Sequence, residues 1–128
     1  MSSSDKYSVK KQLENGDKYY IAINPDYEKA FKWYEKATLQ EDASSQYWIA
    51  LLYKLGYGTK IDYTEAFKWL EKSANQGNIH AILLLANNYY FGDGVKQNKM
   101  KAKQLYKKAC EQGNKDSCKN LKKFNFTN

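Results

Sequence analysis

Few residues of this chain have the types and spacing that enzyme chemistry needs. His80 is the sole histidine, so the sequence offers no pair of histidines for a metal site or a proton relay. A serine with a lysine three positions later, the spacing of the nucleophile motif in penicillin-binding enzymes, occurs twice, in Ser3-x-x-Lys6 and Ser8-x-x-Lys11. The Ser-Asp-Asn and Lys-Thr-Gly elements that such a site also requires are missing. We therefore expect no catalytic residue, no metal and no cofactor.

Cys110 and Cys118 are the two thiols of the chain, and seven residues separate them. In a reducing cytoplasm such thiols pack as small hydrophobic side chains, whereas in an oxidising compartment they can pair. No further metal ligands converge on them in the sequence. The residues alone do not decide whether these two cysteines form a disulfide or remain free thiols.

An internal repeat predicts the elements that must position any working side chain. Three segments align without gaps, at 26–37, 62–73 and 98–109, so the period is 36 residues at each step. A second pattern, Tyr-x-x-Gly-x-Gly, occupies 53–58 and 89–94 and is also 36 residues apart. Two independent patterns with one period indicate a true structural repeat.

Each repeat is predicted to hold two helices. The first spans about 43–55 in one unit and 79–91 in the next. A residue whose short side chain caps first-turn N–H groups precedes each second helix, at Asp26, Asp62 and Asn98. Glu65 lies three positions after Asp62, which is the spacing of a capping box. The second helix ends at Gly77 or Gly113, since glycine adopts the left-handed conformation at low cost.

Small residues mark the predicted contacts between helices. We expect Ala50 to face Ala66, and Ala86 to face Ala102, so that paired helices approach closely. Trp33 and Trp69 occupy equivalent positions of the second helix, and we interpret both as core residues.

At Ala-x-x-Leu-Tyr-x-x-Gly-x-Gly, Asp-Tyr-x-x-Ala-Phe-x-Trp and Lys-x-x-x-x-Gly-Asn, the chain resembles the Sel1-like repeat family, relatives of the tetratricopeptide repeat. The resemblance covers residues 43–114 and implies an all-α fold, an α/α superhelix (solenoid) of antiparallel helix pairs that serves as an adaptor or scaffold. The predicted single domain, 1–128, then contains a partial repeat at 7–42, full repeats at 43–78 and 79–114, and a capping helix at 115–123. Phe124 to Asn128 is predicted to be a frayed tail.

The resemblance also implies a binding site. In tetratricopeptide-like stacking the first helix of each unit lines a concave groove, and tyrosines in such a groove are good anchors. The positions that the resemblance assigns to the groove are Tyr47, Leu51, Lys54, Leu83, Asn87 and Tyr90. A cysteine-rich subgroup of the family has the spacing of Cys110 and Cys118, pairs them in a disulfide, is exported, and is described as binding or hydrolysing penicillins.

The charge bears on the class of partner. The net charge is +7, carried by 21 lysines without an arginine, and the excess lies from residue 65 onward. Lysine excess is compatible with an anionic partner, but the lack of arginine argues against nucleic acid, since arginine dominates phosphate and guanine recognition. No apolar run is long enough to span a membrane.

The leading hypothesis is therefore a protein-binding adaptor, in one specific form an immunity protein that neutralises a bacterial toxin effector. The partner is a protein or a peptide, and the chain itself is a monomer or a weak homo-oligomer. The alternative is an exported Sel1-like protein with weak β-lactam-binding or β-lactamase activity. The polar N-terminus has no signal-peptide core, so we expect a cytoplasmic protein, or a periplasmic or secreted one if a signal peptide has been removed.

Overall fold

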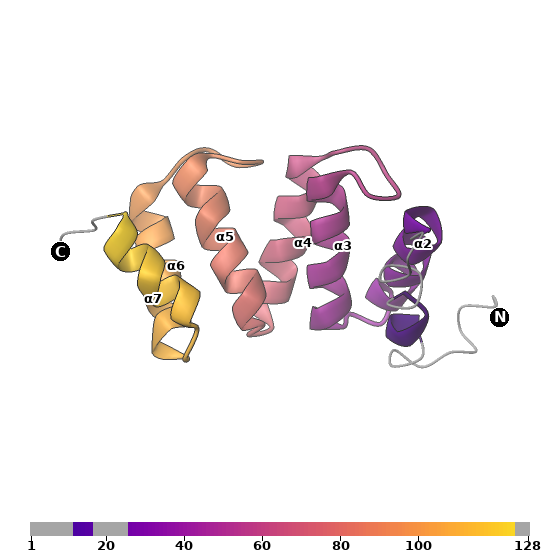
Figure 1. The fold of residues 1–128 in the computed structure, drawn as a ribbon, viewed down its shortest axis with the longest axis horizontal. Helices are drawn as coiled ribbons and strands as arrows, with labels where there is room; N and C mark the ends of the chain where they lie inside the picture. Colours follow the sequence, from indigo (N-terminus) through magenta and orange to yellow (C-terminus); the bar gives the residue numbers. More distant parts are fainter. Residues whose placement is uncertain (1–11, 17–25, 125–128) are drawn as a thin grey trace.

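The computed structural model describes residues 12–16 and 26–124, and every regular element in these ranges is an α-helix. Residues 12–16 are helical. The remaining helices follow in chain order: α2 (Tyr27–Thr38), α3 (Ala43–Leu55), α4 (Tyr63–Asn75), α5 (Ile79–Phe91), α6 (Lys99–Glu111) and α7 (Lys115–Lys123). Figure 1 shows them stacked side by side along one long axis, with each helix packed against the next along the chain. The predicted all-α solenoid is confirmed.

A capping side chain begins each of the six helices. The three predicted caps accept an N–H three residues later, as do three further ones at Asp42, Asn78 and Asn114. The capping box predicted at Asp62 is only half formed. The Glu65 N–H donates to Asp62 Oδ1 at 3.0 Å, but the Asp62 N–H donates to the Tyr53 carbonyl at 2.9 Å. The Glu65 carboxylate instead lies 3.7 Å from Lys68 Nζ.

Glycines with positive φ follow the ends of four helices, α3 to α6. Gly56 and Gly92 cap α3 and α5 in the left-handed conformation, with φ of 70° and 76°. Helices α4 and α6 end at Asn75 and Glu111, two residues before the predicted glycines. The sequence pattern thus located these ends to within one turn.

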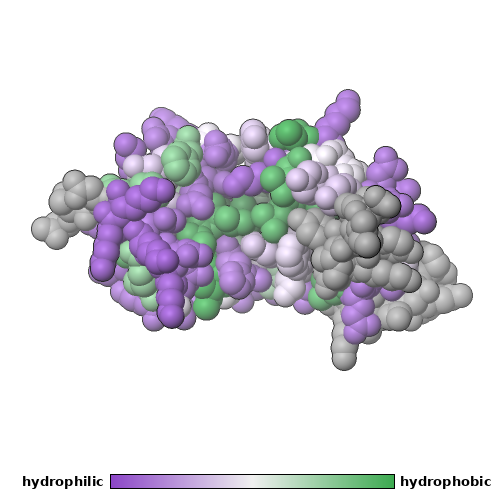
Figure 2. All heavy atoms as spheres, in the orientation of Figure 1, coloured by the Kyte–Doolittle hydropathy of each residue, from purple (hydrophilic) through white to green (hydrophobic). Residues whose placement is uncertain are grey.

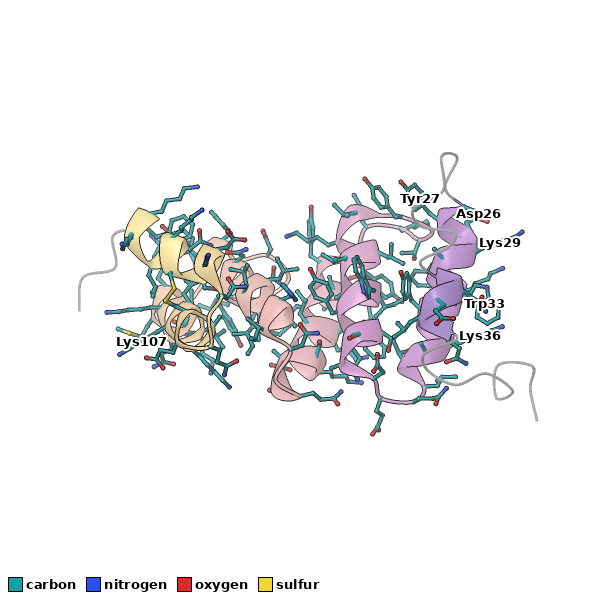
Figure 3. All side chains as sticks on the ribbon, turned by 60° about the horizontal axis from the view of Figure 1, so that its bottom comes forward. Asp26, Tyr27, Lys29, Trp33, Lys36 and Lys107 are labelled. Carbon is teal, nitrogen blue, oxygen red and sulfur yellow. A yellow bond between two sulfur atoms is a disulfide. The ribbon has the colours of Figure 1, made fainter. Side chains whose placement is uncertain are left out.

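The core consists of small and apolar residues at the predicted seams. Ala86 and Ala102 are fully buried in one cluster together with Tyr106, so this predicted pair is confirmed. Ala50 and Ala66 are also buried. Trp69 is half-buried between two core clusters. Trp33 is half-buried on α2, with Lys36 Nζ 4.8 Å from its ring (Figure 3), and its place in the core stays a prediction.

Consecutive repeats meet through two recurring contacts. The Phe31 ring packs edge-on against Tyr53, and 36 residues later Phe67 packs in the same way against Tyr89, with centroids 5.2 Å and 5.5 Å apart. A Cβ added to Gly94 would lie 2.1 Å from the Tyr63 carbonyl oxygen, so the loop after α5 lies directly on the start of α4. The equivalent glycine, at 58, makes the same contact with the start of α2.

The C-terminal prediction needs one correction. Residues 115–123 form a helix, α7, as predicted, but Phe124 is not part of a frayed tail. Its ring stacks on Tyr90 at a centroid distance of 4.1 Å, because that helix brings it back over α5. Residues 125–128, and the predicted start of the first repeat at 7, lie outside the described residues.

None of the helices in the described ranges is both long enough and apolar enough to cross a membrane.

Candidate protein-binding groove

Helices α3, α5 and α7 lie on the near side of the stack in Figure 1 and form one face, which we call the groove face. Helices α4 and α6 lie behind them. The arrangement follows from the repeat, because α3, α5 and α7 are the first helices of successive 36-residue units. Each of these helices therefore presents residues from equivalent positions of the repeat on this face.

The six residues that the family resemblance assigned to the groove are all half-buried. Three come from α3 and three from α5, at repeat-equivalent positions, so the fold sets them in two parallel rows: Tyr47, Leu51 and Lys54; Leu83, Asn87 and Tyr90. Half-burial suits an anchoring role, since such side chains have a fixed position and retain an accessible surface. Binding at these positions remains a prediction.

Tyr47 joins the two rows. Its ring lies 5.4 Å from Trp48 on its own helix and 5.9 Å from His80 on α5, and it packs against the core cluster that includes Ile82. His80 itself is exposed at the start of α5. Tyr47 is therefore held by its neighbours before any partner arrives.

Asn87 has a structural role as well as a place in the groove. The hydroxyl of the fully buried Tyr106 donates a hydrogen bond to Asn87 Oδ1. Burial, with a smaller contribution from Tyr90, raises the pKa of the Tyr106 phenol well above its ordinary value. The Asn87 oxygen thus serves the fold, which leaves its amide nitrogen for a partner.

Tyr90 belongs to an aromatic cluster that the sequence did not predict. Phe124 stacks on it, Phe91 packs edge-on with its centroid 4.9 Å away, and Lys99 Nζ lies 5.3 Å from its ring. Phe91 is 56% exposed, so this cluster reaches the surface. Its local signal in the sequence was three consecutive aromatic residues, Tyr89 to Phe91, at the end of a predicted helix.

The middle of the groove face is apolar. Figure 2 shows hydrophobic side chains gathered across the centre of this face, with hydrophilic ones at the end that carries α6 and α7. Leu83 packs against the Ala86 cluster, and Leu51 is half-buried one turn after Tyr47.

A disulfide joins Cys110 of α6 to Cys118 of α7, with 4.8 Å between their Cα atoms (Figure 3). The equivalent positions one repeat earlier are Ala74 and Ile82, which pack together in the core. The bond therefore replaces an apolar contact at the same seam and fixes α7 to the stack.

Two shallow hollows lie away from the six predicted residues. One surrounds the start of α2, where Asp26, Tyr27 and Lys60 line it (Figure 3), and the other is lined by Leu39, Trp69 and further residues. Neither converges on a nucleophile or a metal-ligand set. Within residues 12–16 and 26–124, no group of three or more His, Cys, Asp or Glu side chains is placed to hold a metal ion.

Comparison with known proteins decides the family. The Sel1 repeat model matches residues 13–42, 43–78 and 79–114, well over half of the chain. The chain belongs to the Sel1 repeat family. Sel1 repeats commonly form scaffolds for protein–protein interaction and typically bind proteins. A search of the curated proteins gave no match.

Solved Sel1 repeat structures share the fold. A protective antigen present in uropathogenic Escherichia coli strains, which displays this fold, is 32% identical with a TM-score of 0.87 over 92% of this chain. The chain spans only 26% of that protein. A Sel1 repeat protein from Oxalobacter formigenes is 29% identical with a TM-score of 0.82, covering 94% of this chain and 92% of its own. Cysteine rich protein B of Helicobacter pylori is 24% identical, with a TM-score of 0.76 and 92% coverage of both chains, and shares the fold.

Proposed function

We propose that this Sel1 repeat protein is an adaptor that binds a protein partner across the groove face. The observation that carries the proposal is the half-buried apolar stripe along α3 and α5, contributed by repeat-equivalent residues. Aromatic and aliphatic side chains that are already held in place lose little entropy on binding and act as anchors.

The test is capture of partners from native lysate with wild-type and variant protein. We expect Tyr47→Ala with Leu51→Ala to abolish capture of a partner that the wild type retains. Tyr90 is left unchanged, because its stack on Phe124 belongs to the fold.

A matched control removes apolar side chains elsewhere. Leu39 and Met100 are 75% and 64% exposed and lie outside the groove face, so Leu39→Ala with Met100→Ala removes a comparable apolar area. Circular dichroism verifies folding of both variants. Equal capture by the groove variant and the wild type contradicts the proposal.

Within this class we propose neutralisation of a bacterial toxin effector as the finer role. An immunity protein acts by covering a working surface of its toxin, which the groove face could do. If a neighbouring gene encodes a toxin, co-expression of this chain is expected to restore the growth of cells that produce it. If the Tyr47 and Leu51 variant protects as well as the wild type, the groove does not act in this way.

The disulfide favours one alternative, an exported protein with weak β-lactam-directed activity, since structural disulfides persist in oxidising compartments. Thiol alkylation in intact cells separates this alternative from the cytoplasmic protein that we propose. Bonded cysteines support export, and free thiols support the cytoplasm. A nitrocefin assay without turnover above buffer ends the enzymatic alternative.

A further inference from the structure

The repeat register extends the groove rows onto α7, where two lysines occupy the equivalent positions. Lys119 is equivalent to Tyr47 and Leu83, 72 and 36 residues earlier. Lys123 is equivalent to Leu51 and Asn87. Both lysines are exposed. The groove rows are therefore mainly apolar or aromatic over α3 and α5, with Lys54 and Asn87 as their polar members, and basic over α7.

The positive charge is concentrated at this end of the molecule. Residues 1–95 contain eleven lysines and twelve acidic residues, a net charge of −1. Residues 96–124 contain ten lysines and two acidic residues, a net charge of +8, which together give the +7 of the chain. The last two helices thus form a strongly positive end on an otherwise neutral stack.

This charge is not neutralised within the fold. The two ion pairs of the described residues both lie in earlier helices, Lys29 with Asp26 and Lys68 with Glu65. Two lysines of the basic end are placed over aromatic rings, Lys99 over Tyr90 and Lys123 over Phe124 at 5.7 Å. Contact with a ring leaves the charge of an exposed ammonium group available to an anion.

We propose that the groove face binds a polypeptide with an apolar segment over α3 and α5 and a cluster of Asp or Glu side chains over α7. This inference rests on the proposed function and specifies the chemistry of the partner. Figure 2 shows the corresponding change from hydrophobic to hydrophilic along the face. Charge complementarity at one end fixes the direction in which the partner lies and increases its rate of association.

The two parts of the face belong to helices that are not direct neighbours, because each helix packs mainly against the one before it and the one after it in the chain. A partner must therefore extend across α5 to contact both α3 and α7.

A polypeptide fits this surface better than a nucleic acid. Arginine is absent, although it is the main residue of phosphate and base recognition. The aromatic faces that single-stranded bases would stack on are occupied, since Tyr90 and Phe124 stack on each other. The half-buried Leu51 and Leu83 would also have no counterpart on a phosphate backbone.

The test is selection from a random peptide library displayed on phage, with the full-length chain as bait. We expect selected peptides to combine Leu, Ile or Phe in one part with Asp or Glu in another. Selection on Lys119→Glu with Lys123→Glu is expected to retain the apolar residues and lose the acidic ones. Selection on Tyr47→Ala with Leu51→Ala is expected to lose the apolar residues, and this bait reports on the proposed function by itself.

A selected peptide then serves as a fluorescence-anisotropy probe. Lys119→Glu with Lys123→Glu is expected to weaken its binding about tenfold, because two attractive contacts become repulsive. The control is Lys101→Glu with Lys108→Glu on α6, which alters the net charge equally at exposed positions outside the groove rows, and it should change the affinity less than about threefold.

Three outcomes overturn the inference. One is an equal loss of affinity in the two lysine variants, which would reflect the overall field alone. Another is a set of selected peptides without acidic residues that still depends on Tyr47 and Leu51, in which case the proposed function stands. The third is tighter binding of a DNA duplex or of phosphatidylserine vesicles than of any peptide at physiological salt, through Lys119 and Lys123.

Discussion

Tyr106 shows at the residue scale how one buried polar group ties two helices together. Its side chain is fully buried between α5, α6 and α7, and its hydroxyl is satisfied by Asn87, 19 residues earlier. A buried hydroxyl without a partner is costly, so the fold depends on this pairing. Burial is also the main reason that the phenol holds its proton so strongly.

Alkaline pH should therefore destabilise the protein. A phenol with a raised pKa binds its proton more tightly in the folded state, so its stabilisation is complete below the unfolded pKa near 10 and is lost as pH rises above it. We expect the free energy of unfolding to fall above about pH 10. Denaturant titrations at neutral and alkaline pH, followed by circular dichroism, measure this loss.

The variant Tyr106→Phe tests whether the loss of stability at alkaline pH comes from the Tyr106 phenol. It should cost about 1 kcal/mol at neutral pH, because the hydrogen bond to Asn87 is lost, and it should reduce the alkaline loss. Part of the loss should remain, since burial raises the pKa values of Tyr53 and Tyr89 too. A variant that loses stability in parallel with the wild type would show that Tyr106 does not titrate as inferred.

Sequence reasoning predicted little at this scale beyond the capping residues. The N-caps are short-range features, determined within three residues, and the sequence identified three of the six. The bond between Tyr106 and Asn87 and the stack of Phe124 on Tyr90 depend on how α6 and α7 return to α5. No local pattern encodes such contacts, so the sequence did not reveal that Asn87 and Tyr90 also serve the fold. That the six residues bind a partner stays a prediction.

At the scale of elements, the glycines separate two effects that the sequence alone could not distinguish. Gly77 and Gly94 both have positive φ, of 89° and 72°. Nothing lies within 4 Å of a Cβ added at Gly77, whereas one added at Gly94 would collide with the carbonyl of Tyr63. The helices were predictable because the 3.6-residue period, the caps and the glycines agree. The close approach of the loop after α5 to the start of α4 was not predictable from the sequence.

We expect Gly77→Ala to destabilise the protein by about 1 kcal/mol, the cost of a left-handed conformation for a residue with a Cβ. Gly94→Ala should cost several times as much, roughly 3 kcal/mol or more, because the loop must also move away from α4. Thermal unfolding of the two variants gives the comparison. Equal costs would mean that the loop moves freely away from α4.

The disulfide provides a second prediction for an element. Cys110→Ala with Cys118→Ala is expected to lower the free energy of unfolding by about 2–3 kcal/mol, as for a cross-link that closes a short loop. The loss should be concentrated in α7, which packs mainly against α6. Hydrogen exchange should show faster exchange of α7 amides and little change in α3. Unchanged protection of α7 would mean that packing alone holds the helix.

At the scale of the whole molecule, the fold and the charge are distributed differently. The 36-residue period predicted the solenoid because it reports on the packing of every unit. The charge gradient was visible in the sequence as an excess after residue 65, and the 36-residue register assigns two of the lysines to the groove rows, but only the structure shows that both are exposed. The residues that repeat therefore predict the fold, and the residues that do not repeat determine the charge of the surface.

Repulsion among the ten lysines of residues 96–124 should make stability depend on salt. Counterions screen exposed charges within about 10 Å at 0.1 M salt, so we expect the melting temperature to rise between low and moderate concentrations of sodium chloride. The Lys101→Glu and Lys108→Glu variant should melt higher at low salt and respond less to added salt. A melting temperature that is independent of salt in the wild type would show that the lysines lie too far apart to repel.

The contact of Gly58 with the start of α2, and of Gly94 with the start of α4, bears on how such proteins can be cut and recombined. The glycine of each repeat contacts the second helix of the preceding repeat. A segment that keeps all of these contacts therefore does not begin and end where the family repeat does. A chimaera joined at the family boundary of 78 would separate α4 from the loop that covers its first turn. A junction placed after that loop, near 97, would transfer a helix together with its cover. Grafting experiments should therefore place their junctions according to the contact between loop and helix and not according to the 36-residue period of the sequence.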